Sequence, residues 1–453
     1  MNNRQMELLL KQFDKFGYYI DRKTEDDIEE NRKGRFVLKF TDKDGNSLNN
    51  VRVRVKQISH EFKFGCTLFH LNQFDDERRN ELYKERFKEL FNYAVVPLYW
   101  DTLEPEEGKY RFDENSVKIK RRPPVDVIMN FCKENNIRTK GHCLIYNSFQ
   151  PDWISDDNRE IRIQIDRRLK AIAQRYPDEM TDVDVINEMV SIYKNGYKGN
   201  ACRNLQITDD PDHEKWCFDI CKKHFPHSRL FWNEGIFACF GGYGEHYRGD
   251  KSIYYMLLRH WIEKGAPIEG IGMQFHGYAD DDELFDIHKE TMHPLRILDV
   301  FDRYSDFGLP IHISEVSVPS YSNEPHDEQL QAEMVRRLYK LWFGRKNCDA
   351  VVWWNLVDNT AHQDENRFMA GLLRENCDYK PAFKALDELI NKEWKTGLED
   401  TVNGEMRFSG FYGEYEIEAV YNDRKITRVI KLHRDNTGFD NRLCDFRSTN
   451  IVL

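Results

Sequence analysis

Eight short apolar runs recur between residues 62 and 358, and this repetition constrains the fold more than any other feature. Each run has the length of a buried strand, and the intervening stretches carry apolar residues at helical spacing, as in "REIRIQIDRRLKAIAQRY". The runs cover residues 62–69, 93–100, 137–146, 183–187, 229–234, 268–276, 310–316 and 350–358. Eight strand–helix units predict a (β/α)8 TIM barrel, an α/β fold whose active site lies at the carboxyl ends of the strands.

The segments outside this repeat alternate with the two-residue period of antiparallel strands. Residues 35–56 form two such runs around Asp44-Gly45, which predicts a hairpin. Residues 404–435 contain three or four short runs, and we expect a small accessory β-sandwich-like domain there, with the N-terminal strands as candidates to join it. Its turns are expected at Gly410, Gly413 and Asn422-Asp423.

The chain of 453 residues is therefore divided into four predicted parts. Residues 1–32 form an N-terminal helical extension, and residues 33–60 form β strands that pack with the C-terminal β domain. Residues 61–395 form the catalytic barrel, and residues 396–453 form the small C-terminal β domain.

Charge and hydropathy restrict the partners. The 67 basic and 78 acidic residues give a net charge of −11, which disfavours nucleic acid or an anionic membrane as the main partner. No apolar run reaches 18 residues, and the ten cysteines form neither a disulfide-like nor a zinc-like pattern. We expect a cytoplasmic protein with reduced thiols, or a secreted one if a signal peptide has been removed.

Two glutamates end apolar strands. "VDVIN" is followed directly by Glu188, and in "PIHISEV" the residues Ile311, Ile313 and Glu315 share one strand face. A structural salt bridge can explain one such carboxylate, but two of them, three strands apart, favour a functional pair. A pair of carboxyl groups, one donating a proton and the other attacking or activating water, is what glycoside hydrolysis requires.

With these glutamates, six segments resemble glycoside hydrolase family 10, the family of many endo-β-1,4-xylanases. The similarity runs from "FKFGCTLF" to about Glu393 and includes both glutamate motifs. The matching segments are "WDTLEPEEGKYRFD", "KGHCLIYNSFQPDW", "DVDVINEMV", "IEGIGMQFH", "PIHISEVSV" and "WWNLVD". The resemblance implies a retaining hydrolase of β-1,4-xylosidic bonds in xylan or xylo-oligosaccharides.

The resemblance also implies the role of each site residue. Glu188 is the acid/base and Glu315 the nucleophile, while Asn187 binds the sugar 2-hydroxyl. His276 orients Glu315, and Gln274 reaches toward Glu188. The remaining substrate-binding residues are His142, Tyr146, Asn233, Trp354 and Trp100. Neither a cofactor nor a metal is implied, and the expected partner is a carbohydrate.

One stretch departs from the family pattern. Where the family has Glu, Asn and Lys after its second strand to hold a neighbouring xylose, this chain has Val95, Val96 and Tyr99. Loss of these polar groups removes hydrogen bonds on which xylan specificity depends. Another β-linked glycan or glycoconjugate is therefore an alternative substrate, and a non-catalytic carbohydrate-binding barrel is a more remote one.

Overall fold

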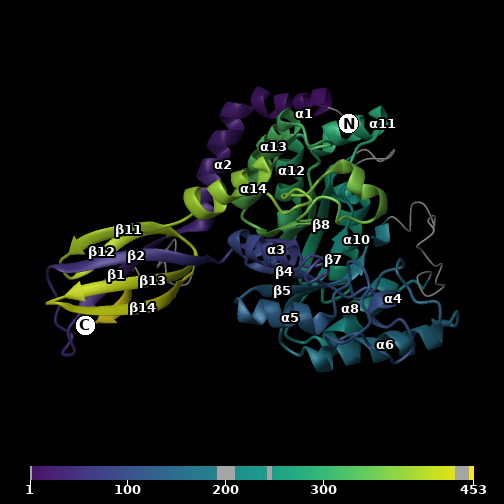
Figure 1. Cartoon of the computed structure of the whole chain (residues 1–453), viewed down its shortest axis with the longest axis horizontal. Coiled ribbons are helices and arrows are strands. Elements are labelled where there is room, and N and C mark those ends of the chain that lie inside the picture. The colour runs from purple at the N-terminus through teal and green to yellow at the C-terminus, as the bar shows by residue number, and fades with distance from the viewer. Residues whose placement is uncertain (1–2, 191–209, 242–246, 434–447) are drawn as a thin grey trace. The chain divides into compact units, whose positions relative to one another are not determined.

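The computed structural model describes residues 3–190, 210–241, 247–433 and 448–453. The chain divides into two compact units, each assembled from separate segments (Figure 1). The first unit contains residues 1–17, 64–342 and 347–385. The second contains residues 18–63, 343–346 and 386–453.

The first unit is a closed barrel of eight parallel strands, in the order β10-β3-β4-β5-β6-β7-β8-β9. Its strands are β3 (Lys63–Thr67), β4 (Tyr93–Pro97), β5 (Arg138–His142), β6 (Met180–Asn187), β7 (Arg229–Glu234), β8 (Gly270–His276), β9 (Ile311–Ser317) and β10 (Cys348–Trp353). Nearly every residue of these strands is buried, because side chains fill the barrel on one face and helices cover the other. The predicted TIM barrel is confirmed.

Helices connect successive strands of the barrel (Figure 1). Those beginning in the first unit are α1 (Asn3–Lys15), α3 (Glu77–Leu90), α4 (Trp100–Leu103), α5 (Val125–Glu134), α6 (Asn158–Arg175), α8 (His213–His224), α9 (Ile236–Phe240), α10 (Ile253–Glu263), α11 (Asp282–Thr291), α12 (Pro294–Tyr304), α13 (Pro325–Gly344) and α14 (Pro381–Glu388). Aspartates cap several of them, as when Asp157 accepts hydrogen bonds from the first backbone N–H groups of α6.

The second unit contains two β-sheets and the helix α2 (Gly17–Arg32), with a short π-helical segment over Leu389–Glu393. One sheet has the order β11-β2-β13-β14 and the other β12-β1-β15. The strands are β1 (Lys33–Thr41), β2 (Val51–His60), β11 (Gly397–Val402), β12 (Glu405–Phe411), β13 (Gly413–Tyr421), β14 (Arg424–Leu432) and β15 (Ser448–Val452). Alternate residues of both sheets, such as Phe36, Leu38, Val53 and Ile417, form one buried core. The accessory β domain is confirmed, with N-terminal strands in each sheet.

Two local predictions in this unit are wrong. β1 and β2 do not form a hairpin, because β1 pairs with β12 and β15 while β2 pairs with β11 and β13. The chain does turn between them, through a bridge from Thr41 to Ser47. Strands from the C-terminal segment, all antiparallel except β15, nevertheless pair along the edges of both strands. Gly410 is not a turn residue, since it lies within β12. The predicted turn at Asn422-Asp423 is confirmed, and both residues have the positive φ that a tight hairpin turn needs.

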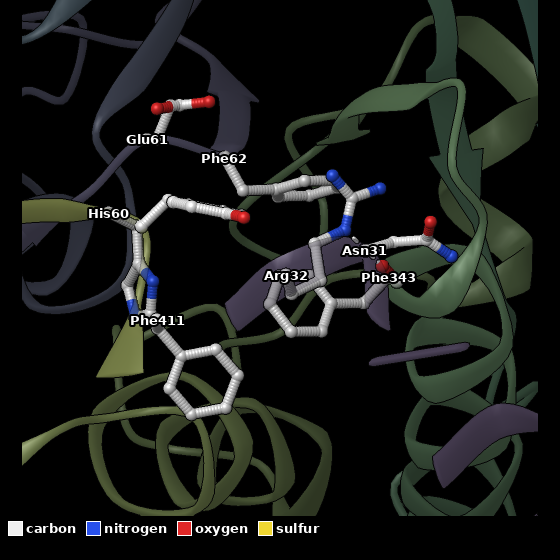
Figure 2. Close-up of a pocket in the computed structure, with 8 residues that line it drawn as sticks. Asn31, Arg32, His60, Glu61, Phe62, Phe343 and Phe411 are labelled. Carbon is white, nitrogen blue, oxygen red and sulfur yellow. Dashed lines mark hydrogen bonds between the residues drawn. The ribbon is translucent and has the colours of Figure 1, made fainter. Parts of the chain in front are cut away.

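A small cavity of about 20 Å³ lies in the second unit, lined by residues that include Arg32, Phe62 and Phe343. Figure 2 shows the guanidinium of Arg32 beside the ring of Phe62, with its Cζ 4.7 Å from the ring centroid. Nη2 of Arg32 donates to the carbonyl oxygen of Arg345 at 2.5 Å. The cavity has room for about one water molecule.

Among the described residues, no helix is both long and apolar enough to span a membrane. Eight of the ten cysteines lie in the described residues, and all eight are buried free thiols. The other two, Cys202 and Cys444, lie outside the described ranges.

Candidate active site

Strand β6 carries Glu188 to the carboxyl end of the barrel. Residues 182–187 are buried, and Glu188, the next residue, is half-buried. Its φ is 58°, in the left-handed region that a residue with a Cβ seldom adopts. The N–H of Glu188 donates to the carbonyl oxygen of Asn233 at 2.9 Å and so fixes this conformation. Backbone strain held in place by its surroundings is a feature of functional sites.

Strand β9 presents Glu315 at the same end of the barrel, where its side chain is almost fully buried. One nitrogen, Nε2 of Gln274, donates to Oε1 of Glu188 at 2.8 Å and to Oε1 of Glu315 at 3.1 Å. Gln274 reaches both because it is paired with Glu315 in the register of β8 and β9. The two carboxylates are therefore neighbours, although 127 positions in the sequence separate them.

Asn233 of β7 links the ends of three strands. Its Nδ2 donates to Oδ1 of Asn187 at 2.7 Å and to Oε1 of Glu315 at 2.8 Å, and its Oδ1 accepts from Ser314 at 2.5 Å. The side-chain oxygen of Asn187 thus accepts a hydrogen bond from Asn233, while its Nδ2 makes no hydrogen bond to the described residues. That amide nitrogen is a free donor beside both carboxylates.

His276 holds the other oxygen of Glu315. Its Nε2 donates to Oε2 of Glu315 at 3.1 Å, and its Nδ1 lies 2.9 Å from Oγ of Ser317. Burial alone would lower the pKa of His276, but the hydrogen bond to Glu315 and the negative charge of that residue raise it above the ordinary value. A cationic His276 would stabilise Glu315 in its ionised form.

Below this layer, Asp184 positions His142. Its Oδ2 accepts from Nδ1 of His142 at 2.9 Å, and its Oδ1 forms a buried ion pair with Nζ of Lys140 at 2.7 Å. Burial alone would raise the pKa of Asp184, but Lys140 and His142 hold it below its usual value. Nε2 of His142 then lies 3.8 Å from Oε1 of Glu315.

Aromatic rings surround the carboxylates. Tyr146 donates its hydroxyl to Oε2 of Glu188 at 2.6 Å. The ring of Trp354 packs edge-on against His142 and His276, with centroid distances of 5.4 and 5.9 Å. Trp100 has other contacts: its indole N–H donates to Glu104 at 2.9 Å and its ring packs edge-on against Trp153 at 5.9 Å, and it makes no hydrogen bond or ring contact with the described residues around the two carboxylates.

We call Asn187, Glu188, Asn233, Gln274, His276 and Glu315 the amide–carboxylate cluster. The sequence predicted all six as site residues, and the structure places them next to one another. His142, Tyr146 and Trp354 lie beside them. The sequence reasoning missed Asp184. The signal was present in "TDVDVIN", since strand alternation puts Asp182 and Asp184 on one face, inside a run of buried apolar residues.

Glu234, next to Asn233, is a second buried carboxyl group in this region. Burial raises its pKa to about 8, and the charge of Glu188 adds to the increase. Its Oε1 accepts from the indole of Trp232 at 2.8 Å and from the N–H of Val190 at 2.9 Å. Glu234 therefore ties the chain that follows Glu188 to β7.

Within the described ranges, no group of three or more His, Cys, Asp or Glu side chains has an arrangement that could hold a metal ion. The carboxylates of the cluster instead have amide, imidazole and phenol partners.

A family model for glycosyl hydrolase family 10 matches residues 55–389. This match covers well over half of the chain, so the chain belongs to that family of glycoside hydrolases. The resemblance inferred from the six sequence segments is confirmed.

Individual relatives are distant. The anti-sigma-I factor RsgI6 of Acetivibrio thermocellus is 25% identical over 425 residues, covering 92% of this chain and 49% of that protein. Endo-1,4-beta-xylanase 2 of Arabidopsis thaliana is 24% identical over 421 residues, which cover 90% of this chain and 34% of that protein. The chain thus spans about half or less of the length of these two relatives.

Solved structures show the same fold. Xylanase 10B from Thermotoga petrophila RKU-1, solved in complex with xylobiose, superposes with a TM-score of 0.56 at 22% identity. The superposition covers 74% of this chain and 95% of that one.

Proposed function

We propose that this protein is a retaining β-glycosidase that cleaves β-1,4-xylosidic bonds in xylan or xylo-oligosaccharides. Glu188 acts as the acid/base and Glu315 as the nucleophile. A carbohydrate is therefore the expected partner, and the described side chains supply every proton-transfer and nucleophilic group that the reaction needs.

The bridging amide of Gln274 is the observation that carries this proposal. Because one nitrogen contacts both carboxylates, their Oε1 atoms lie no more than about 6 Å apart, which fits the separation of about 5–5.5 Å in retaining enzymes. An inverting enzyme needs a wider gap, of about 6.5–9.5 Å, to hold a water molecule between the sugar and its general base.

In the first step, an oxygen of Glu315 bonds to the anomeric carbon while the bond from that carbon to the leaving oxygen breaks. The proton of Glu188 passes to the leaving oxygen. His276 and Asn233 orient Glu315 before the attack, through hydrogen bonds to its two oxygens.

In the second step, a water molecule attacks the anomeric carbon and Glu188 accepts one of its protons. The bond between the sugar and Glu315 breaks, and both carboxyl groups return to their starting states. The Nδ2 of Asn187, which makes no hydrogen bond to the described residues, donates to the sugar 2-hydroxyl in this proposal, an interaction that strengthens in the transition state.

A non-xylan β-glycan is the second candidate substrate, and the residues of β4 favour it. Val95 and Val96 are buried and apolar, and the following Tyr99 packs edge-on against His142 at 5.5 Å. None of these three side chains offers the carboxylate, amide or ammonium group with which the family holds a neighbouring xylose.

Chemical rescue tests the assignment of the two glutamates. Glu188→Ala and Glu315→Ala should each nearly abolish turnover of an aryl β-xylobioside. Azide should restore activity to Glu188→Ala on a substrate with an activated leaving group and give the β-glycosyl azide. In Glu315→Ala, azide takes the place of the missing nucleophile and should give the α-glycosyl azide, and NMR distinguishes the two products.

Glu81→Ala is the matched control, because Glu81 is an exposed partner of Lys84 on α3 and should not affect turnover. Formation of the α-azide by Glu188→Ala, or full activity in either glutamate variant, would contradict the proposal.

A further inference from the structure

The segment "KIKRR", residues 118–122, contains four cationic residues, and two of them contact rings that border the candidate active site. Lys118 and Lys120 are exposed, whereas Arg121 and Arg122 are 6% and 7% exposed. Buried arginines are normally paired with a carboxylate, because an uncompensated buried charge is costly. We call Arg121 and Arg122 the arginine pair.

The described residues supply no carboxylate to the arginine pair. Arg121 donates through Nη1 to Oδ1 of Asn355 at 2.9 Å and to the carbonyl oxygen of Thr360. Arg122 donates through Nη1 to the carbonyl oxygen of Arg121 at 3.0 Å. Within the described ranges, neither Nε nor Nη2 of either arginine makes a hydrogen bond. The nearby acids Asp101 and Glu365 attract the pair without reaching ion-pair distance.

A short chain of side chains connects this pair to the nucleophile. The Cζ of Arg122 lies 3.9 Å from the centroid of the Tyr99 ring, and that ring packs against His142. His142 in turn lies 3.8 Å from Glu315. On the other side, both arginines lie over Phe69, whose ring is 5.3 Å from that of Trp354.

The barrel topology indicates which part of a substrate the pair faces. Its contacts lie after β4, at Tyr99, and after β10, at Asn355 and Thr360. β3 separates β4 from β10 in the closed barrel, whereas Glu188 follows β6. On the proposed chemistry the leaving group lies beside Glu188, so the sugars that remain attached to Glu315 extend toward β10, β3 and β4.

We propose that the arginine pair binds an anionic group, a carboxylate or a sulfate ester, on the sugar next to the one that reacts. This inference rests on the proposed glycosidase function and specifies its substrate as an acidic β-glycan. The free N–H groups of Arg121 and Arg122 donate to the anion, and its negative charge offsets their buried positive charge. Val95 and Val96 are buried and apolar, so their side chains offer no polar donor at this end of β4.

The pKa of the neighbouring His70 is also affected by these positive charges. His70 is buried, and burial together with the charges of Arg121, Lys120, Arg122 and Arg79 lowers its pKa to about 3. Its imidazole therefore stays neutral and adds no further positive charge to the site.

Three matched aryl β-1,4-disaccharides test the proposal in the full-length protein. The sugar distant from the aryl group is a neutral xylose, a uronic acid or a sulfated xylose. We expect kcat/KM for one of the acidic substrates to exceed that for the neutral one by at least about tenfold, and the preference to shrink with added salt. The preferred acidic substrate identifies the anion as carboxylate or sulfate.

Arg122→Gln and Arg121→Gln should each reduce this preference about tenfold or more, whereas Arg303→Gln should retain it, since Arg303 is a surface residue paired with Asp299. If the Arg121 and Arg122 variants fail to fold, the ratio of kcat/KM values for the acidic and neutral substrates in the wild type, and its dependence on salt, still test the inference. Equal hydrolysis of all three substrates overturns this inference alone. No hydrolysis of any substrate overturns the proposed function, and this inference with it.

Discussion

The two sides of the barrel's carboxyl end use different kinds of interaction. At the ends of β6, β7, β8 and β9, the amide–carboxylate cluster and Tyr146 form a hydrogen-bond network in which each oxygen of Glu188 and Glu315 has a named donor. Beyond β4 and β10, aromatic rings and the arginine pair dominate, and several guanidinium N–H groups make no hydrogen bond to the described residues.

On the proposed function, the first region carries out the chemistry and the second recognises the substrate. A satisfied network fixes the positions of the reacting groups and leaves little freedom for substitution. A set of rings with unused donors can instead bind a variable partner, since ring stacking and charge attraction tolerate several geometries. Substitutions in the cluster should therefore lower kcat, and substitutions among the rings should raise KM.

The largest effect is expected at Asp184, which supports the network from below. Asp184→Asn leaves the Lys140 ammonium buried without a counter-charge, and unfolding in urea should show a loss of about 3–5 kcal/mol. Because the folded-state pKa of Asp184 is below its unfolded value, its contribution is present above about pH 4 and is lost as the pH falls through the folded value.

Asp358→Asn is the matched control, because Asp358 also pairs with a buried lysine, Lys380, at 3.1 Å. Both variants should be less stable, but only Asp184→Asn should also lower kcat, since only Asp184 orients His142. Equal kcat values for the two variants, each measured well below its melting temperature, would show that His142 does not depend on Asp184.

Asn233→Ala should come next in size. It removes the donor to Oε1 of Glu315 and the partner of Asn187, so kcat on an aryl β-xylobioside should fall by about 10²–10³ with little change in KM. The exposed Asn115, bonded to Asp113, provides the control Asn115→Ala. A rise in KM at unchanged kcat would contradict this prediction and show that Asn233 contributes to substrate binding instead.

Phe149→Ala tests the recognition side with a smaller expected effect. The half-buried ring of Phe149 packs at 4.9 Å from Tyr99 and 5.7 Å from His362, and the Cζ of Arg122 is 5.6 Å from its centroid. Loss of this surface should raise KM for a disaccharide glycoside about five- to tenfold and leave kcat nearly unchanged. A loss confined to kcat would contradict the division between the two sides.

The sequence predicted the barrel and the cluster for the same physical reason. A strand buried on both faces appears as a continuous apolar run, so a polar residue such as Glu188 or Glu315 at its end is conspicuous. The roles of these residues stay predictions. The hairpin around Asp44-Gly45 failed because local turn signals do not determine which distant strand, such as β12 or β13, becomes the partner. The arginine pair went unnoticed because a basic segment usually indicates a solvated surface, and burial is a tertiary property.

The smallest predicted effect concerns the pH dependence of stability at His276. The unfolded-state pKa of histidine is about 6.5, and Glu315 raises the folded value. The imidazolium–carboxylate interaction therefore contributes fully below about pH 6.5 and is lost as the pH rises through the folded pKa. The difference in unfolding free energy between wild type and His276→Gln should therefore shrink from pH 6 to pH 9.

His288→Gln is the control, because the folded-state pKa of His288 is lowered whereas that of His276 is raised. Burial lowers the pKa of His288 to about 4, so His288 is neutral in both folded and unfolded states above about pH 7. Its effect on stability should not change between pH 7 and pH 9, whereas that of His276 should still change there. A constant difference for His276→Gln across this range would mean that His276 is neutral beside Glu315. The Glu315 carboxylate would then be held by hydrogen bonds from neutral groups alone.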